Sequence, residues 1–219
     1  MRTDYERNLK QLQNKVLNLG SMVEHALIVS MDAMKNRDLK SAEKLIKEDE
    51  KINKKRFEIE EDCIHLIATQ APMASDLRII VAVLNIIIDL ERIGDHAAGN
   101  AQIAIMLGDD PPLKPLIDLP RMAEKTADML RRSLDAFVKR DAVEARTVAA
   151  DDDEIDGLYD QIFRELLLFM AEDPKTVGRA TRLIWAAHNL ERSADRVTNV
   201  CERVVFVVTG KQEEIGGKY

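Results

Sequence analysis

Two stretches one hundred residues apart carry nearly the same sequence, and the fold can be worked out from them. They are Asp89-Leu90-Glu91-Arg92-Ile93-Gly94-Asp95 and Asn189-Leu190-Glu191-Arg192-Ser193-Ala194-Asp195. Each places a Glu and an Asp four positions apart in an apolar segment, and such positions share one face of a helix. Two carboxylates on one face repel each other unless a positive group lies between them. Each stretch therefore predicts either a polar seam between helices or a cation site.

The repetition extends well beyond these stretches. Residues 33–38 match residues 136–141, and residues 49–53 match residues 152–156, both at an offset of 103. The Glu-Arg-x-x-Asp stretches match at an offset of 100, so the halves differ by three residues around the turns at Pro72 and Pro174. A repeat of this length predicts two copies of one three-helix unit.

Six long helices are expected from the apolar spacing and the breaks between the spaced segments. Few aromatic residues (4 %), 9 Gly and 6 Pro favour helices over a sheet. The predicted fold class is all-α, with two tandem three-helix bundles related by a pseudo-twofold. The bundles are expected at residues 1–108 and 116–219, with a Pro-rich linker at 109–115. The expected helices cover residues 3–36, 38–69, 75–107, 116–139, 141–172 and 174–210.

Composition excludes several classes of protein. The net charge of −7 argues against nucleic-acid binding and favours metal cations or basic partners. The longest apolar run, Ile79 to Ile88, is too short to span a bilayer, which needs roughly 20 residues. Cys63 and Cys201 make no disulfide framework, and the charged N-terminus is no signal peptide. We therefore expect a cytoplasmic protein without membrane insertion.

The duplicated acids are expected to meet across helical hairpins. Helices joined by a tight turn run antiparallel, so residues whose numbers average to the turn centre lie at one level. This geometry predicts two sets of oxygen side chains: Asp49, Asn53, Glu91 and Asp95 in the first half, and Asp152, Asp156, Glu191 and Asp195 in the second.

Clustered carboxylates are hard oxygen ligands, so both sets predict metal sites. The second is expected to bind more strongly, because it has four acids plus Asn199, with His188 or Glu202 as further candidates. In the first, Asn53 replaces an acid and Gly99 stands at the position of Asn199. The alternative is a solvated acidic groove neutralised by arginines, namely Arg92, Arg192 and Arg196.

Other chemically notable residues are expected to be structural. His96 lies about 100° around its helix from Asp95 and is expected to be exposed. Trp185, Cys201 and the methionines are expected in the core.

At these residues the sequence resembles the PhoU family, bacterial regulators of phosphate uptake. The resemblance rests on both Glu-Arg-x-x-Asp stretches, on residues 70–78 and 152–156, and on Pro111-Pro112-Leu113 in the linker. It implies two three-helix bundles, and multinuclear metal clusters, iron in some members, on the acidic motifs. It also implies a cytoplasmic protein at the inner membrane face, linking the ATPase subunit of the phosphate ABC transporter to the phosphate-sensing histidine kinase.

We therefore interpret the chain as a metal-binding adaptor that represses phosphate uptake and phosphate-starvation signalling, and we expect it to form a homodimer. There is no Gly-rich phosphate loop and no nucleophile–base pairing, so no catalysis is expected. A di-metal carboxylate enzyme, hydrolase or oxidase, is the alternative function. A purely structural bundle without metal is a third.

Overall fold

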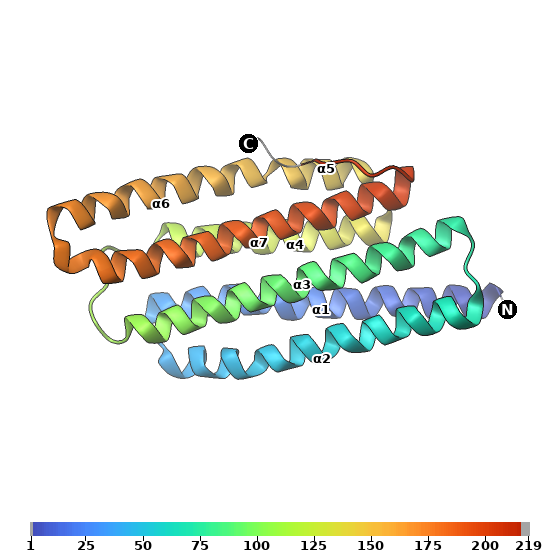
Figure 1. Cartoon of the computed structure of the whole chain (residues 1–219), viewed down its shortest axis with the longest axis horizontal. Coiled ribbons are helices and arrows are strands. Elements are labelled where there is room, and N and C mark those ends of the chain that lie inside the picture. Colours follow the sequence, from blue (N-terminus) through green and yellow to red (C-terminus); the bar gives the residue numbers. More distant parts are fainter. Residues whose placement is uncertain (1, 216–219) are drawn as a thin grey trace.

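The computed structural model describes residues 2–215, and this part of the chain is helical almost throughout (Figure 1). The predicted all-α fold class is confirmed. A short 3-10 helix, η1 (Pro174–Thr176), precedes the last helix. The α-helices are α1 (Arg2–Asn36), α2 (Leu39–Gln70), α3 (Ala74–Leu107), α4 (Asp118–Lys139), α5 (Ala142–Ala150), α6 (Asp152–Glu172) and α7 (Val177–Thr209).

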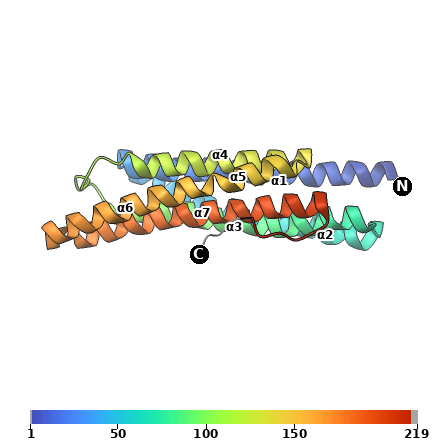
Figure 2. The same ribbon diagram turned by 90° about the horizontal axis from the view of Figure 1, so that it is seen from above.

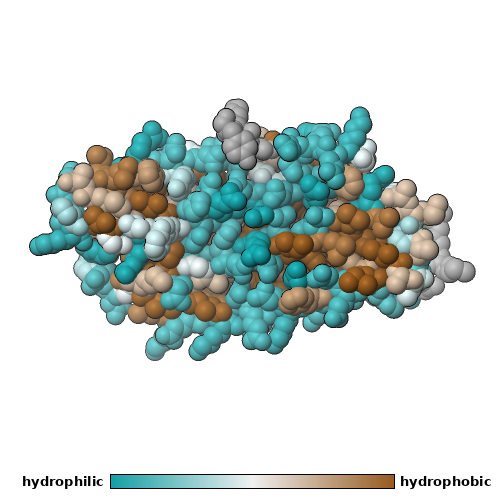
Figure 3. All heavy atoms as spheres, viewed as in Figure 1, coloured by the Kyte–Doolittle hydropathy of each residue, from teal (hydrophilic) through white to brown (hydrophobic). Residues whose placement is uncertain are grey.

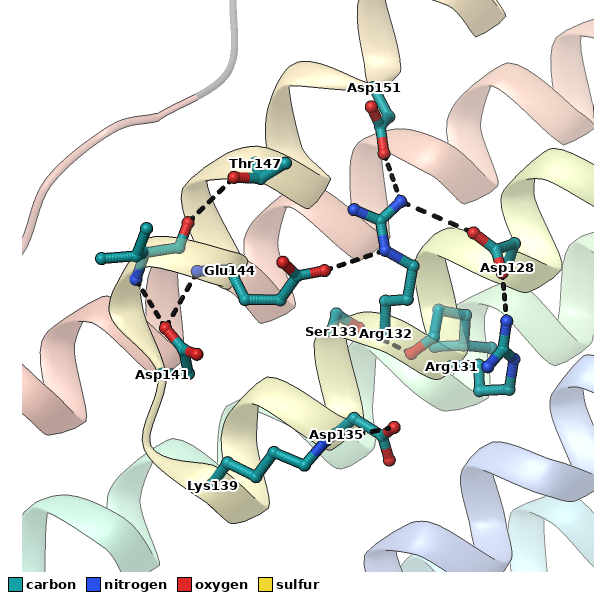
Figure 4. A network of polar contacts seen from close by, with 12 residues as sticks. Asp128, Arg131, Arg132, Ser133, Asp135, Lys139, Asp141, Glu144, Thr147 and Asp151 are labelled. Atoms are coloured by element: carbon teal, nitrogen blue, oxygen red, sulfur yellow. Dashed lines mark hydrogen bonds and ion pairs between the residues drawn. The ribbon is translucent and has the colours of Figure 1, made fainter.

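The fifth expected helix differs from the prediction, because it is divided into α5 and α6 at Asp151. Four acids in succession, residues 151–154, begin α6, where negative side chains meet the positive end of the helix dipole. Arg132 of α4 holds this turn from below, with contacts to Asp151, Glu144 and Asp128 (Figure 4). The break therefore follows from an acidic run that suits a helix start and from an arginine that binds it there.

The same local turn occurs in both repeats, at the places where the sequence repeats. Arg37 and Arg140 end α1 and α4 with φ of 57° and 54°. Asp38 then accepts a hydrogen bond from the Ser41 backbone N–H at 3.1 Å, and Asp141 accepts one from that of Val143 at 3.0 Å. A capping aspartate satisfies free N–H groups at a helix start, so each repeat begins its middle helix by the same means.

The helices pack in two layers. Figure 2 shows α1 and α4 in one layer, and α2, α3, α6 and α7 in the other. The apolar stripe expected on the first helix lies in the core: Val16, Leu19, Val23 and Leu27 are fully buried. Burying each such side chain stabilises the fold by roughly 1.5–3 kcal/mol. One core cluster runs through both repeats, so the bundle limits at 1–108 and 116–219 stay a prediction.

A polar seam joins the repeats where α3 and α7 run antiparallel. Asp89 lies opposite Asn199, and Asn189 donates to Asn100 Oδ1 at 2.9 Å. In two antiparallel helices, residues at the same level have numbers with a constant sum, and both pairs give about the same sum. Repeat-equivalent residues of α3 and α7 differ by 100, and such a pair lies at one level only beside Asp95 and Asp195. The pseudo-twofold axis therefore crosses the seam there. The axis is perpendicular to the layers in Figure 1.

The expectations for His96 and Trp185 were wrong, and the expectation that the methionines lie in the core fails at Met73 and Met106. His96 is half-buried, with Nδ1 3.2 Å from Ser193 Oγ, because α7 packs on the side of α3 that carries it. Burial lowers the pKa of His96 to about 4, so the imidazole is neutral at pH 7. Trp185 and Met73 are 54 % and 78 % exposed rather than in the core, whereas Cys201 is buried as expected. None of the helices described between residues 2 and 215 contains an apolar stretch that could span a lipid bilayer.

Candidate metal-binding grooves

The second predicted set of acids lines a groove between α6 and α7. Asp152 and Asp156 come from the first two turns of α6, and Glu191 and Asp195 from the middle of α7. All four line a groove of about 740 Å³. We call it the second groove, and by analogy alone we call the equivalent set between α2 and α3, Asp49, Asn53, Glu91 and Asp95, the first groove.

Asp152 shows the strongest electrostatic effect in the second groove. Burial raises the pKa of its carboxyl group to about 7, and the negative charges of Asp156, Asp195 and Glu191 add to the effect. Its Oδ1 is buried without a hydrogen-bond partner. A carboxylate oxygen that is buried and unpaired is costly unless a proton or a cation joins it.

The carboxyl groups of Glu191 and Asp156 are subject to the same two electrostatic effects as that of Asp152. Burial raises the pKa of both carboxyl groups, and the charge of Asp195 raises it further in each. Glu191 Oε2 is buried without a hydrogen bond, although it lies 3.3 Å from His188 Nδ1. His188 therefore contacts an acid of the second groove without lining the groove itself, and its role as a further ligand stays a prediction.

Arginines neutralise part of the groove. Arg192 Nη1 donates to Asp195 Oδ2 at 2.7 Å. Arg196 also lines the groove, but it lies 3.3 Å from Asp89 of the other repeat. An arginine therefore neutralises the charge of Asp195, as the alternative reading of the groove expects, whereas Asp152 Oδ1 has no such partner.

Asn199 and Glu202 occupy the rim. Asn199 donates from Nδ2 to Asp89 Oδ1 at 3.3 Å, so its amide nitrogen faces the seam between the repeats. Glu202 Oε1 accepts a hydrogen bond of 3.1 Å from the backbone N–H of Ile215. The segment after α7 thus folds back onto the rim, and Glu214 and Ile215 line the groove. No periodic signal in the sequence marks this return, so it was not predicted.

The first groove has the same plan with fewer free oxygens. Burial raises the pKa of Asp49, and the charge of Asp95 raises it further. Asp49 Oδ1 is buried and unpaired, but Oδ2 accepts from Asn53 Nδ2 at 3.2 Å. Burial and Asp95 also raise the pKa of Glu91, while Arg92 pairs with Asp95 at 3.1 Å. The predicted neighbours thus lie together in both halves.

The grooves have the donor chemistry of a cation site without its closed arrangement. Carboxylate oxygens that are buried and unpaired suit a hard cation. Within residues 2–215, however, no three His, Cys, Asp or Glu side chains are grouped closely enough to hold a metal ion. In the second groove, Arg192 already donates to one of the two carboxylate oxygens of Asp195.

Two segments of the chain, residues 16–104 and 119–204, match the PhoU domain. The chain is 39 % identical over 212 residues to the phosphate-specific transport system accessory protein PhoU homolog of Clostridium acetobutylicum, covering 96 % of this chain and 97 % of that protein. It is 35 % identical over 205 residues to the homolog of Aquifex aeolicus, covering 94 % and 93 %.

Two crystal structures have the same fold. PhoU from Pseudomonas aeruginosa matches with a TM-score of 0.90 at 33 % identity, covering 94 % of this chain and all of that one (100 %). The phosphate transport system regulatory protein PhoU from Streptococcus pneumoniae matches with a TM-score of 0.89 at 31 % identity, covering 95 % and 99 %. The chain therefore belongs to the PhoU family of accessory regulatory proteins of phosphate transport, which are not enzymes.

Proposed function

We propose that this chain represses phosphate uptake and phosphate-starvation signalling as a metal-binding adaptor. Its partners would be the ATPase subunit of the phosphate ABC transporter and the phosphate-sensing histidine kinase. A regulator without an active site acts by binding the states of its partners with different affinities. Because the family is not enzymatic, we propose an adaptor and not a di-metal carboxylate enzyme.

The observation that supports metal binding is the pair of buried, unpaired carboxylate oxygens in the second groove, on Asp152 and Glu191. A divalent or ferric cation would be held by Asp152, Asp156, Glu191 and Asp195, with Asn199 at the rim. Its charge would offset the burial and the repulsion that together raise the pKa of Asp152.

The first groove would bind more weakly, through Asp49, Asn53, Glu91 and Asp95. The Asn53 amide already donates to Asp49 Oδ2 there, and an amide supplies no negative charge. A multinuclear cluster, with iron as one candidate, is compatible with carboxylates that can bridge ions.

The test of metal binding is elemental analysis of protein purified without a histidine tag. The double variant Glu191→Ala, Asp195→Ala should lose the metal of the second groove while helicity, followed by circular dichroism, is kept. The matched control is Glu124→Ala, Asp135→Ala, which removes two exposed acids from α4 in the other layer. Metal content that is unchanged in the first variant would refute this site.

The test of the adaptor role is genetic and biochemical. In a strain that lacks this protein, phosphate-starvation genes should stay on in rich phosphate. The chain should co-purify with the ATPase subunit or the kinase, and the complexes should weaken as salt rises, because exposed charges are screened within about 10 Å at 0.1 M. Normal repression in the deletion strain, with no complex at low salt, would refute the adaptor. The homodimer and the location at the inner membrane face stay predictions.

A further inference from the structure

Each acidic groove continues into an exposed apolar surface toward its hairpin turn. On α3, Leu77, Val81 and Ile88 are 38 %, 39 % and 45 % exposed, and they lie on the helical stripe that carries Glu91 and Asp95. On α2, Phe57 and Ile64 are 57 % and 58 % exposed. These five apolar residues form the first apolar patch.

The second repeat also exposes apolar side chains toward its hairpin turn, on α6 and α7. Phe163 and Leu167 of α6 are 38 % and 45 % exposed, and Val177 and Trp185 of α7 are 44 % and 54 % exposed. These four residues form the second apolar patch. Trp185 and Phe163 are the kind of large amphipathic or aromatic side chain that anchors protein interfaces.

The two patches lie on one face of the molecule, related by the pseudo-twofold axis. Figure 3 shows apolar areas toward both ends of this face, with hydrophilic side chains between them. The motif acids lie close to the axis, whereas Val81 is about 20 Å from it at the helical rise of 1.5 Å per residue. Leu167 lies at the corresponding level of its own hairpin, so the patches are about 40 Å apart.

We propose that this face docks a protein that is itself twofold symmetric, with two apolar elements about 40 Å apart and basic side chains between them. Scattered apolar residues are normal on a surface, but apolar patches rimmed by polar residues mark interaction sites. Here two such patches lie at equivalent levels of the two hairpins, and Leu77 and Ile64 of the first correspond in the repeat to Val177 and Leu167 of the second. The acidic centre supplies the complementary charge for basic groups and sets the orientation.

A second copy of this chain does not fit the same face. Twofold docking of two copies would bring the four motif acids, Glu91, Asp95, Glu191 and Asp195, against the same four acids of the partner. Juxtaposed like charges cost several kcal/mol at an interface. The expected homodimer would therefore have to use another face, and this one is left for a partner of opposite charge.

The inference rests on the proposed function for the existence of a partner, but not on the presence of metal. A cation in either groove would offset part of the acidic charge. The affinity of a basic partner is therefore expected to be higher after chelation than in the metal-loaded protein.

The experiment measures dissociation constants of the full chain, by calorimetry, with the purified ATPase subunit of the phosphate transporter and with the cytoplasmic part of the sensor kinase. The variants Val81→Glu and Leu167→Glu place a negative charge in the first and second patch. Val138→Glu is the matched control, because Val138 is 40 % exposed on α4 in the other layer. Circular dichroism and thermal melting verify that all three variants fold.

We expect Val81→Glu and Leu167→Glu each to weaken binding of the same partner at least tenfold, with the control within twofold of the unsubstituted chain. Weakening by one patch variant alone would overturn docking by a twofold-symmetric partner. Binding that both patch variants retain would overturn the docking surface and leave the adaptor role intact. Equal weakening by all three variants would also overturn it, because the effect would then be one of net charge. No binding by the unsubstituted chain at low salt would refute the proposed function, and the docking surface with it.

Discussion

The charge on Asp152 should destabilise the metal-free protein at neutral and alkaline pH. Its pKa rises from 3.8 to about 7 on folding, so the folded state favours the protonated form. A raised carboxyl pKa gives stability that is present below the unfolded pKa and is lost as pH rises through the folded pKa. The window for this loss is therefore about pH 4 to 7.

The magnitude follows from the size of the shift. At 1.36 kcal/mol per pKa unit, the whole shift corresponds to about 4 kcal/mol. Asp152 is only partly buried, so solvent screening reduces this to about 2 kcal/mol. The variant Asp152→Asn should be more stable than the unsubstituted chain by about 2 kcal/mol at pH 8, and by less than about 1 kcal/mol at pH 5.

Urea unfolding with a chelator present, at pH 5 and at pH 8, measures this difference directly. For a chain of this length, 2 kcal/mol corresponds to a melting temperature higher by about 4–8 °C. The neighbouring exposed residue provides the control, and Asp153→Asn should change stability little at either pH. If Asp152→Asn destabilises the protein at pH 8, or acts equally at both pH values, the electrostatic reasoning is wrong. Added metal should reverse the order of stability, because the variant lacks one of the proposed ligands.

Two further predictions concern the interior. Asp89→Ala should destabilise the protein by about 1–2 kcal/mol, because it leaves a partly buried guanidinium unpaired. Asp89→Asn should be nearly neutral, since the amide oxygen can still accept hydrogen bonds from Asn199 and Arg196. Equal losses of stability in chemical denaturation would contradict this. Cys63 and Cys201 are fully buried, and burial raises the pKa of each thiol to about 12. Thiol reagents should therefore label them only when the protein unfolds. Rapid labelling of the folded protein would contradict this and would show that the core opens.

Much of the architecture could be predicted because the two halves of the sequence repeat the same pattern of apolar residues, acids and turns. The spacing of residues such as Val16 and Val23 marks a buried stripe, and the structure buries both. The hairpin levels bring Asp152 near Glu191, because they depend only on helical rise and the position of the turn. Metal binding by these acids stays a prediction. The periodicity of the sequence shows which side chains lie together, but it does not show which ion they bind.

The errors arose where one helix meets the other repeat or a local run of charge. His96 was placed on the exposed side because its own helix gives no sign of α7 packing there. The break at Asp151 depends on an acidic run and on Arg132, far from it in sequence. Trp185 was assigned to the core by residue type alone, although its helix position faces outward. Such features depend on contacts between segments, which no single-helix pattern contains.

The seam between α3 and α7 has a consequence for how duplicated proteins diverge. In a dimer of identical units, every change appears on both sides of the axis, so position 89 would meet a copy of its own surroundings. Here Asp89 meets Arg196 and Asn199, whereas its counterpart Asn189 meets Asn100. Joining the units in one chain has allowed the two sides of one interface to evolve separately. The two sides of the seam now carry different side chains. A dimer made of two copies of one repeat would therefore not reproduce the contacts of this seam.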